Sequence, residues 1–472
     1  MSFIAEAGRF ISELSLNDVP EATVDRARLQ CLSMMAASLA AHSDPVASAA
    51  AKRIAQRGSI GESTILGLEC KRNAIDAVAA NSILSMSLDY DDYCFMGHTG
   101  HSSVLASLAM AEHTNATVSE FLCSVIAANE IGGRLGAATF FGPQNGQMWT
   151  HIHLAGAAAA SARLIGLNAH QTADALALAL AQPPSVLQAG FFGADSKVLA
   201  ASAPSSSGMY AAELAADGLR GELGIVEGRR GVLSTLAWWP LEGLLTGLGE
   251  VWLTDTLAYK VYPGCAYIDS AVDGLLSITG GAAQHNPPVH DISVRATGLT
   301  WGMERYSRRW ASPHLTPIGI NFSVQKSLAV AWVAGELSPA QLTPEWLSSH
   351  EDLLHKAQSQ IRLIHDLRLT GKLVKEYSWI LRAGKLTARR FMLNAQRLRG
   401  LTFPFSAIVH ACGETQRVAL PLGSPGRPWS ETEELMIAKL AGQTSRPAAE
   451  SVMSALNRPN GRVRDLVMAL GR

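Results

Sequence analysis

The feature that most restricts the fold of this chain is the helical spacing of small apolar residues through its first half. The segment 20–41 opens on a proline and continues with an apolar stripe at the spacing of one helix face. Thr117 and Glu120 form a capping-box pattern ahead of a second apolar stretch, 121–131. The spacing therefore predicts that residues 1 to about 255 form an all-helical bundle rich in Ala and Leu.

The residue pattern changes near Lys260, after which segments typical of strands occur. Three segments alternate apolar and polar side chains and are rich in β-branched or aromatic residues, which predicts strands over 290–297, 364–371 and 401–411. Helical spacing between them predicts helices over 324–337 and 344–358. A smaller α+β domain is therefore expected after the bundle.

The predicted fold class is mainly α with an α+β lid. Ser430 and Ser445 are placed to begin two further helices, which we expect to return to the bundle. A chain of 472 residues is too long for one ordinary core, which favours two domains. The expected division is the N-terminal part of a helical domain, the lid, and C-terminal helices that rejoin the helical domain, over 1–256, 257–424 and 425–472.

Charge and composition exclude several classes of function. Lys and Arg total 39 against 40 Asp and Glu, and no basic stripe or acidic tail suggests a nucleic acid or an anionic membrane as partner. The richest apolar stretch, 154–167, is interrupted by Arg163 and is too short to cross a bilayer. The N-terminus has no long apolar region, so no secretory signal is expected. Six scattered cysteines without a C-x-x-C pair indicate reduced thiols in a soluble, cytoplasmic protein.

A cluster of proton-handling side chains lies between two helical segments within residues 81–112: Asp89, Asp91, Asp92, Tyr93, His98 and His101. Gly97 and Gly100 are expected to let the backbone turn sharply there. Loops held by rigid helices commonly carry catalytic groups, which favours an active site. The alternative is a solvated loop whose aspartates cap the next helix.

This cluster carries a resemblance to the MmgE/PrpD family. The strings NSILSMSLDYDD and HTGHSS are similar to the family's Asn-Gly, His-x-Leu-Asp-x-Asp-Asp-Thr and His-Pro-Ser segments. Ser82, Met86 and Tyr93 stand where the family has Gly, His and Thr, and the segment around His101 lacks the Pro. The family includes 2-methylcitrate dehydratase, cis-aconitate decarboxylase and iminodisuccinate epimerase, which act on small polycarboxylates. The resemblance implies a large helical domain built from both chain ends, a late α+β lid, no cofactor and a homodimer.

The second candidate is the pair His151 and His153, directly before a helix predicted over 154–167. Two histidines at this spacing can bind a metal, but no carboxylate or cysteine follows at a convincing distance, so no metal site is predicted. His153 is also placed to cap or pack against the helix start. The resemblance implies a functional histidine here, for which His151 is the better match and His153 the rival.

Two lysines are expected to bind substrate carboxylates. Lys197 lies in an almost uncharged segment, and a buried ammonium needs a partner, which an anionic substrate would supply. The alternatives are a surface position or pairing with Asp195. Lys260 begins a match to the family's Lys-x-Tyr-Pro-x-Cys, in which a turn at Pro263 separates it from Cys265. Cys265 is expected to be structural because no histidine lies close to it in sequence.

A further motif lies in the predicted lid. Residues 317–327 resemble the family's Phe-Ser-x-Pro-Tyr segment, whose tyrosine reaches the active site. Gln325 and Lys326 occupy the Pro and Tyr positions, so a hydroxyl is replaced by a cation or, if buried, by a lysine of lowered pKa that can act as a base. The alternative is a lysine on the solvent face of a helix.

Together these residues predict an acid/base enzyme acting on a small carboxylate, with Asp89 as the base, His101 as the acid, and lysines that stabilise an enolate-like intermediate. The resemblance implies a cofactor-independent lyase or isomerase, with a dehydratase first and an epimerase or decarboxylase next. A divergent member acting on a less acidic molecule, or a binding protein without turnover, stays open. The complete predicted set is Asp89, His101, His151 and Lys326 for catalysis, and Lys197, Lys260, Tyr93 and His153 for substrate binding.

Overall fold

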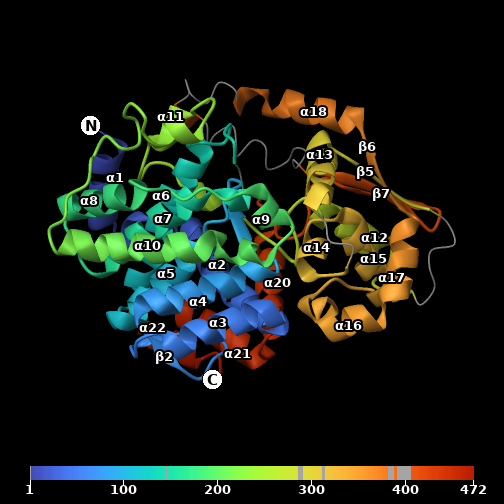
Figure 1. Cartoon of the computed structure of the whole chain (residues 1–472), viewed down its shortest axis with the longest axis horizontal. Helices are drawn as coiled ribbons and strands as arrows, with labels where there is room; N and C mark the ends of the chain where they lie inside the picture. Colours follow the sequence, from blue (N-terminus) through green and yellow to red (C-terminus); the bar gives the residue numbers. More distant parts are fainter. Residues whose placement is uncertain are drawn as a thin grey trace.

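The computed structural model describes residues 2–144, 146–284, 291–310, 314–380, 387, 389–390 and 405–471. A large helical body lies beside a smaller lid (Figure 1). From its N-terminal part the body takes helices α1 (Phe3–Glu13), α2 (Glu21–Ala40), α3 (Pro45–Arg57), α4 (Ala74–Ser87), α5 (Gly100–His113), α6 (Val118–Ala138), α7 (Thr150–Leu164), α8 (Ala169–Leu180), α9 (Gln188–Phe192), α10 (Leu199–Ala216) and α11 (Val232–Leu236). No helix among the described residues is long and apolar enough to span a membrane.

Local signals place these helices where the sequence predicts them. Pro20 precedes α2, and the side chains of Thr117 and Glu120 cap the start of α6 reciprocally, so both predicted helix starts are confirmed. Small residues then allow close packing of α7 against α5, α6, α8 and α10. A Cβ added at Gly208 of α10 would lie 2.3 Å from the backbone oxygen of Leu154 in α7, so this approach requires glycine.

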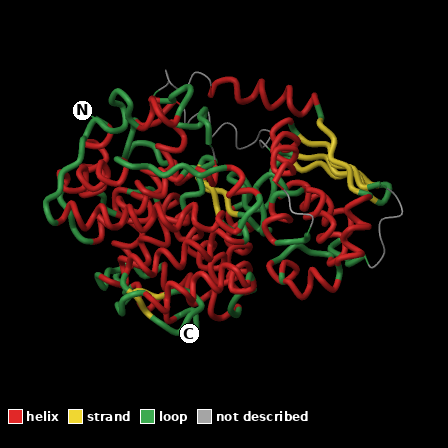
Figure 2. The backbone as a smooth tube through the Cα atoms, in the orientation of Figure 1, coloured by secondary structure: helices red, strands yellow, loops and turns green. Residues whose placement is uncertain are grey.

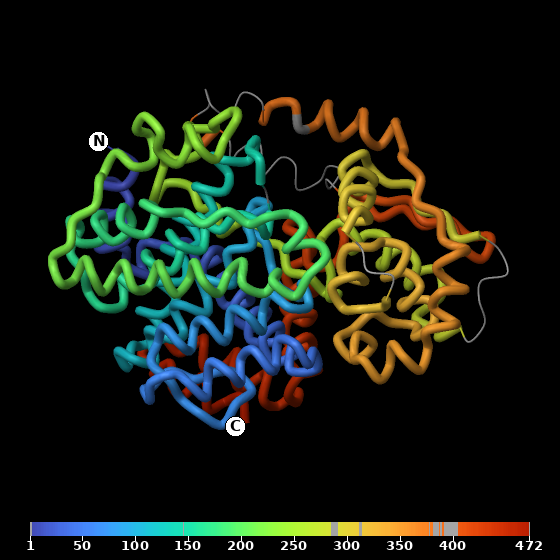
Figure 3. The backbone as a smooth tube through the Cα atoms, viewed as in Figure 1, coloured from blue at the N-terminus to red at the C-terminus, as the bar shows by residue number. Residues whose placement is uncertain are grey.

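Among the described residues three C-terminal helices return to the body, where two are predicted: α20 (Trp429–Ala441), α21 (Arg446–Leu456) and α22 (Val463–Met468). Ser445 caps α21 as predicted, whereas α20 begins at Trp429, after Pro428, and not at Ser430. Helices α20 and α21 pack on α2, and α22 packs on α5. In Figure 3 these last segments lie among the earliest ones, below the middle of the body. Both ends of the chain therefore build the helical body, while the residue boundaries of the domains stay a prediction.

The lid combines helices with a sheet at its outer side (Figure 2). Its four-stranded sheet has the order β6-β5-β7-β8, with β5 parallel to β6 and the other pairs antiparallel. Helix α12 packs on β7 and β8. The lid elements are α12 (Asp269–Thr279), β5 (Ile292–Ala296), α13 (Gly298–Ser307), α14 (Pro317–Asn321), α15 (Val324–Ala334), α16 (Pro344–Ser349), α17 (Glu351–Ser359), β6 (Ile361–His365), α18 (Leu367–Tyr377), β7 (Ala407–Ala411) and β8 (Glu414–Val418). The chain is thus mainly α with a small α+β part.

Two element predictions in the lid need correction, and a third lies partly outside the described residues. The strand predicted over 364–371 covers only the end of β6, because Asp366 caps a new helix, α18, by accepting from two backbone N–H groups. The helix predicted over 344–358 is two helices, α16 and α17, separated at His350. Of the strand predicted over 401–411, residues 401–404 lie outside the described residues, and the remainder contains β7.

A short strand pair joins the body to the lid and positions the candidate site. Strand β3 (Asp92–Cys94) follows α4 and pairs antiparallel with β4 (Leu257–Tyr259), which leads into the lid. The backbone N–H of Lys260 also donates to the carbonyl oxygen of Asp91 at 3.1 Å. Short additional strands, β1 (Ser63–Thr64) and β2 (Lys71–Arg72), pair elsewhere in the body. The seam of β3 and β4 therefore brings together residues more than 160 positions apart in sequence.

Candidate active site

The three aspartates of the loop between α4 and α5 are fully buried: Asp89, Asp91 and Asp92. Helix α5 has Thr99 at its N-cap, without a side-chain cap hydrogen bond. The alternative of a solvated loop whose aspartates cap the next helix is therefore wrong. Buried carboxylates are costly unless they are paired, so the partners of each one define the site.

The backbone of this loop turns at residues other than the predicted glycines. Asp89, Phe95 and Met96 have φ values of 51°, 42° and 74°, whereas Gly97 and Gly100 are not left-handed. Gly100 is required for a different reason, because a Cβ there would lie 2.3 Å from Asp92 Oδ2. Left-handed backbone at a non-glycine residue is strained, and at Asp89 this strain falls on the predicted base.

Asp91 is the centre of the buried polar cluster. Its Oδ1 lies 2.6 Å from Lys260 Nζ, and its Oδ2 lies 2.6 Å from His98 Nδ1 and 3.0 Å from His101 Nε2. Burial alone would raise the pKa of Asp91, but Lys260, His98 and His101 together hold it well below the usual range. Sequence reasoning did not select Asp91 as a site residue, because only folding brings Lys260 to it.

Asp89 is paired with Lys197, as an ion pair between two side chains that have no exposed surface. Lys197 Nζ lies 2.8 Å from Asp89 Oδ1 and donates to the Met86 carbonyl oxygen at 2.6 Å. Gln147 Nε2 donates to the same Oδ1. The alternatives for Lys197, a surface position or pairing with the exposed Asp195, are therefore excluded. Asp89 Oδ2 is buried and has no hydrogen-bond partner among the described residues.

The imidazoles of His101 and His153 are held differently. His101 Nδ1 lies 2.7 Å from Ser85 Oγ, while its Nε2 faces Asp91, so both ring nitrogens have polar neighbours. The His153 ring lies edge-on to the His101 ring at 5.8 Å, and its Nδ1 lies 3.2 Å from Ser102 Oγ. Burial holds the pKa of His153 well below 6.5. Its Nε2 has no hydrogen-bond partner in the described part of the chain.

His151 lies apart from this cluster. Its Nε2 lies 3.0 Å from Thr139 Oγ1, and its ring packs edge-on to Trp149. Burial lowers the pKa of His151 to about 4. Both histidines belong to α7, which begins at Thr150 and therefore earlier than predicted. Since side chains two positions apart on a helix point to different faces, only His153 is turned toward His101. The geometry favours His153 over His151 as the functional histidine.

Asp92 carries a raised pKa beside this cluster. Its Oδ1 accepts from Gln30 Nε2 at 2.8 Å, and its Oδ2 is buried without a hydrogen-bond partner among the residues described. Burial and then the neighbouring Asp91 carboxylate raise the pKa of Asp92 to about 7. Asp92 therefore changes its charge near neutral pH.

We predict that the Asp92→Asn variant loses part of the pH dependence of stability. Because the folded-state pKa is raised from 3.8 to about 7, the folded protein keeps a proton that the unfolded chain releases in this window. Stability from this group is therefore present at low pH and falls as pH rises toward 7. Asparagine does not titrate and still accepts from Gln30. Urea midpoints at pH 5 and pH 8 should differ less in the variant than in the wild type, and an equal difference would contradict the assignment.

Lys439 of α20 stabilises the backbone next to the site, a role that was not predicted from the sequence. Its Nζ donates to the carbonyl oxygens of Tyr90 at 2.5 Å and Lys260 at 2.9 Å, and to Ser33 Oγ at 2.9 Å. Burial lowers the pKa of Lys439 to about 7. Helix α20 thus holds the backbone just before β3 and just after β4.

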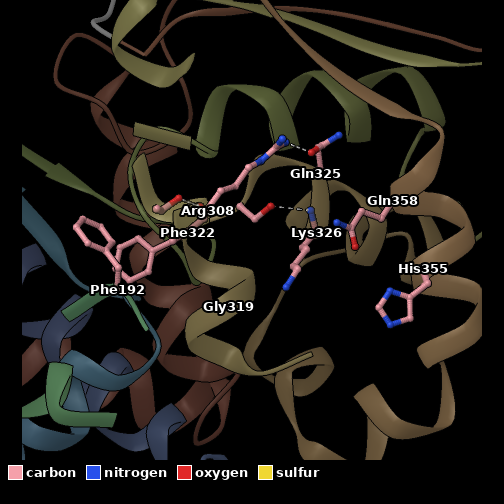
Figure 4. A pocket seen from close by; sticks show the side chains of 10 residues that line it. Phe192, Arg308, Gly319, Phe322, Gln325, Lys326, His355 and Gln358 are labelled. Carbon is pink, nitrogen blue, oxygen red and sulfur yellow. Dashed lines mark hydrogen bonds between the residues drawn. The ribbon is translucent and has the colours of Figure 1, made fainter. Parts of the chain in front are cut away.

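Of the remaining predicted residues, Tyr93 lies at the edge of the cluster and Lys326 lies apart from it. Tyr93 is buried on β3, with its ring 6.0 Å from the His98 ring. Cys265 follows the predicted turn, at which Gly264 has a φ of 139°, and burial raises the pKa of its thiol to about 12, which agrees with a structural role. Lys326 lies half-buried on α15 and lines a separate pocket in the lid (Figure 4), and its partial burial lowers its pKa. Its catalytic role stays a prediction.

Asp91, His98 and His101 also form a group that could bind a metal ion, since each offers a ligand atom and these atoms lie within 4.8 Å of one another. The Lys260 ammonium lies 2.6 Å from Asp91 Oδ1. It already neutralises the carboxylate charge that would attract a divalent cation. His98 Nδ1 already shares Asp91 Oδ2 with His101. The donor set is therefore arranged as a charge-paired network rather than as an open metal site.

An apolar cluster lies where the body meets the lid, close to Lys197. It contains two methionines, three phenylalanines and two alanines: Met86, Met148, Phe191, Phe192, Ala200, Ala201 and Phe322. The Phe322 ring lies 5.5 Å from Lys197 Nζ. Met86, at the position of a family histidine, is fully buried in this cluster. The surroundings of the Asp89–Lys197 pair are therefore apolar.

Comparison with known proteins assigns the chain to a family. The N-terminal domain model of the MmgE/PrpD family matches residues 5–239, which include the whole loop and Lys197. This chain belongs to the MmgE/PrpD family. A cis-aconitate decarboxylase-like protein of Aspergillus oryzae is 27% identical over 55% of this chain and 58% of its own length. A cis-aconitate decarboxylase of Aspergillus terreus is 23% identical over 75% of each chain. The match thus spans a little over half of the first relative.

Proposed function

We propose that this MmgE/PrpD chain is a lyase that removes and returns a proton next to the carboxylate of a small substrate. The observation that carries the proposal is the state of Asp89. Its Oδ1 is held by Lys197 and Gln147, while its Oδ2 is buried and has no hydrogen-bond partner among the described residues. Native structures rarely leave a buried carboxylate oxygen without a partner, so a substrate group at this oxygen is the natural explanation.

The charges of the site suggest how Asp89 would act. In the resting site the Asp89 carboxylate neutralises the Lys197 ammonium at 2.8 Å. When Asp89 Oδ2 takes a proton from the carbon beside the substrate carboxylate, Asp89 becomes neutral and the negative charge moves to the substrate. Lys197 is then free to stabilise the enolate-like charge, so its interaction is stronger in the transition state than in the ground state.

The other predicted residues take revised roles in this proposal. Lys260 keeps Asp91 ionised, instead of binding a substrate carboxylate directly, because the pair is fully buried at 2.6 Å. Asp91 and Ser85 orient His101, which we propose donates the second proton. In a dehydration this proton goes to the departing hydroxyl group, which leaves as water, and in an epimerisation it goes to the carbon that Asp89 deprotonated. His153, with a buried Nε2, replaces His151 as the second histidine. Tyr93 as a substrate-binding residue stays a prediction.

Dehydration is the first reaction to test. Decarboxylation is the second, because one relative is named a cis-aconitate decarboxylase-like protein and another a cis-aconitate decarboxylase. Epimerisation uses the same proton step. We further propose a homodimer without a resident cofactor, in the cytoplasm, on the strength of the family resemblance. In the two Asp–Lys pairs each lysine charge is already neutralised by an aspartate. This favours the alternative that the protein is a divergent family member acting on a less acidic molecule.

The experiment that tests the proposal is proton NMR of the purified protein in heavy water. The panel contains di- and tricarboxylates with their 2-hydroxy and 2-amino relatives, and the control is the same protein after heat inactivation. We expect deuterium to replace the hydrogen next to a carboxylate in at least one compound, because the first step exchanges that proton. No exchange across the panel from folded protein would contradict the proposed chemistry.

A further inference from the structure

Two buried oxygen atoms without a partner belong to side chains that contact each other, Asp89 and Gln147. Asp89 Oδ2 and Gln147 Oε1 both lack a hydrogen-bond partner among the described residues. Each of these oxygens is one carbon away from the contact in which Gln147 Nε2 donates to Asp89 Oδ1. The two free oxygens therefore lie in the same part of the candidate site, within reach of one small molecule.

The orientation of the Gln147 amide follows from its neighbour. A carboxylate that is paired with an ammonium group accepts hydrogen bonds, so the amide nitrogen must face Asp89 and the oxygen is the free atom. Gln147 lies in the 3-10 helix Gly146–Met148, and Trp149 donates its backbone N–H to the Gly146 carbonyl oxygen at 3.2 Å. Gln147 is only 5% exposed, and a buried amide oxygen without a donor is rare in native structures.

The Lys197 ammonium, which is paired with Asp89, has no N–H group left for a ligand in the resting site. A lysine ammonium has three N–H donors. One of them faces Asp89 Oδ1, which lies 2.8 Å from Lys197 Nζ. The other two face the carbonyl oxygens of Met86 at 2.6 Å and Ser87 at 3.4 Å. A ligand that contacts Asp89 and Gln147 must therefore bring its own hydrogen-bond donor.

His153 presents a further acceptor. Ser102 Oγ donates its single proton to the Thr99 carbonyl oxygen at 3.1 Å, so it accepts from His153 Nδ1, 3.2 Å away. Because burial holds the pKa of His153 well below 6.5, the ring is neutral, and its buried Nε2 carries a lone pair without a donor. The unpartnered atoms of Asp89, Gln147 and His153 thus all accept hydrogen bonds, and none of them donates.

We propose that Gln147 determines specificity by selecting carboxylates that carry a hydroxyl or amino group on or beside the reacting carbon. Gln147 Oε1 accepts from this group, while the hydrogen on carbon faces Asp89 Oδ2. Since Oε1 has no proton to give, it does not assist the departure of a hydroxyl, and the group that it binds stays on the substrate. The position of the reacting hydrogen rests on the proposed function, whereas the preference for a donor rests on the free acceptors.

The test is isothermal titration calorimetry of the full-length protein with two series of carboxylates. Succinate, malate and aspartate share one skeleton and carry no donor, a hydroxyl and an amino group next to a carboxylate. Propionate, lactate and alanine repeat this comparison with a single carboxylate. In at least one series we expect a donor-carrying member to bind about tenfold more tightly than the donor-free member, because a buried acceptor is then satisfied. The hydroxy and amino members show which donor is bound.

Fluorosuccinate tests the donor without any change to the protein. Its fluorine is similar in size to the hydroxyl of malate but cannot donate a hydrogen bond. If the dicarboxylate series shows the preference, fluorosuccinate should bind no more tightly than succinate. Fluorolactate's counterpart, fluoropropionate, serves the same purpose in the monocarboxylate series. A fluorinated ligand that binds as tightly as the hydroxy acid would show that shape, and not donation, is recognised.

Gln147→Met keeps the length of the side chain and removes the acceptor. All ligands should bind more weakly because Asp89 Oδ1 also loses a donor, but the tenfold preference should fall to within about twofold. A purely structural role of Gln147 would weaken both members of a series equally and leave the preference unchanged. Gln56→Met, at an exposed position of α3, is the matched control and should keep the wild-type preference. Circular dichroism and a thermal melt show whether each variant is folded.

Equal affinities within each series, absence of binding in both series, or a preference that survives in folded Gln147→Met would overturn this inference. The outcome is separable from that of the proposed function, because binding needs no turnover. A preference that is lost in Gln147→Met, without proton exchange by the wild type in heavy water, would support the role of Gln147 and count against the proposed chemistry. Proton exchange on ligands that bind equally well with and without a donor would support the chemistry and refute the selection by Gln147.

Discussion

Replacing Asp89 with asparagine should lower the rate of proton exchange on the substrate by about 10²–10⁴-fold, the usual contribution of a general base. Asparagine keeps the size of the side chain and an oxygen that can accept from Lys197 and Gln147. It cannot take a proton from carbon at neutral pH. The rate of deuterium incorporation measured by proton NMR gives the effect directly.

The control for this variant is Asp195→Asn, in the 3-10 helix Asp195–Val198 that also carries Lys197. Asp195 is exposed, and its replacement should leave the exchange rate unchanged within about twofold. Circular dichroism and a thermal melt show whether Asp89→Asn is folded, since Lys197 loses its counter-charge. Exchange at more than a tenth of the wild-type rate in folded Asp89→Asn would assign the base to another residue.

Replacing Lys260 with methionine should cost about 3–5 kcal/mol of folding stability, because it leaves the buried Asp91 carboxylate without its strongest partner. The two atoms lie 2.6 Å apart, and neither side chain is exposed by more than 1%. The pair also lies directly beside the pairing of β3 and β4, which connects the body to the lid. Urea unfolding at pH 7, followed by tryptophan fluorescence, measures the loss.

The pH dependence of this variant follows from Asp91. In the wild type the pKa of Asp91 is held well below 3.8, so its stabilising contribution is present above that value and is lost as pH falls through the folded-state pKa. Removing Lys260 weakens this contribution. The difference between variant and wild type should therefore be largest at neutral pH and shrink below about pH 4.

Two further variants make the Lys260 prediction specific. Lys356→Met, at an exposed position on α17, should change stability by no more than about 0.5 kcal/mol. Combining Lys260→Met with Asp91→Asn should destabilise less than the sum of the two single variants, because each removes the charge that the other leaves unpaired. Additive effects would show that the pair contributes no coupling.

The helices and the location of the loop could be predicted because their signals are local. The capping box at Thr117 and the proline before α2 act within one helical turn. The same logic failed at 364–371, where an alternating pattern predicted a strand but the Asp366 cap starts α18 within it. At this position a local hydrogen bond outweighed the apparent period of the side chains.

The partners of the site residues could not be predicted in the same way. Lys260 and Asp91 are 169 positions apart, and Lys439 reaches Tyr90 across 349 positions. The choice between His151 and His153 depends on which face of α7 is turned toward α5. The turn at Asp89 has a left-handed backbone at a residue that is not glycine, so the sequence does not indicate it. No short-range pattern carries such information.

The sequence by itself determined the helical body with an α+β lid, the loop rich in Asp and His, and the candidate lysines at positions 197 and 260. It could do so because periodicity, capping and family motifs each depend on residues that are close together in the chain. Only the tertiary structure decided how these charges pair. It joined Asp89 to Lys197 and Asp91 to Lys260, and it placed Lys326 in a separate lid pocket. The reason is physical: burial forces each charge to find a partner, and which partner is within reach depends on how the body and lid pack.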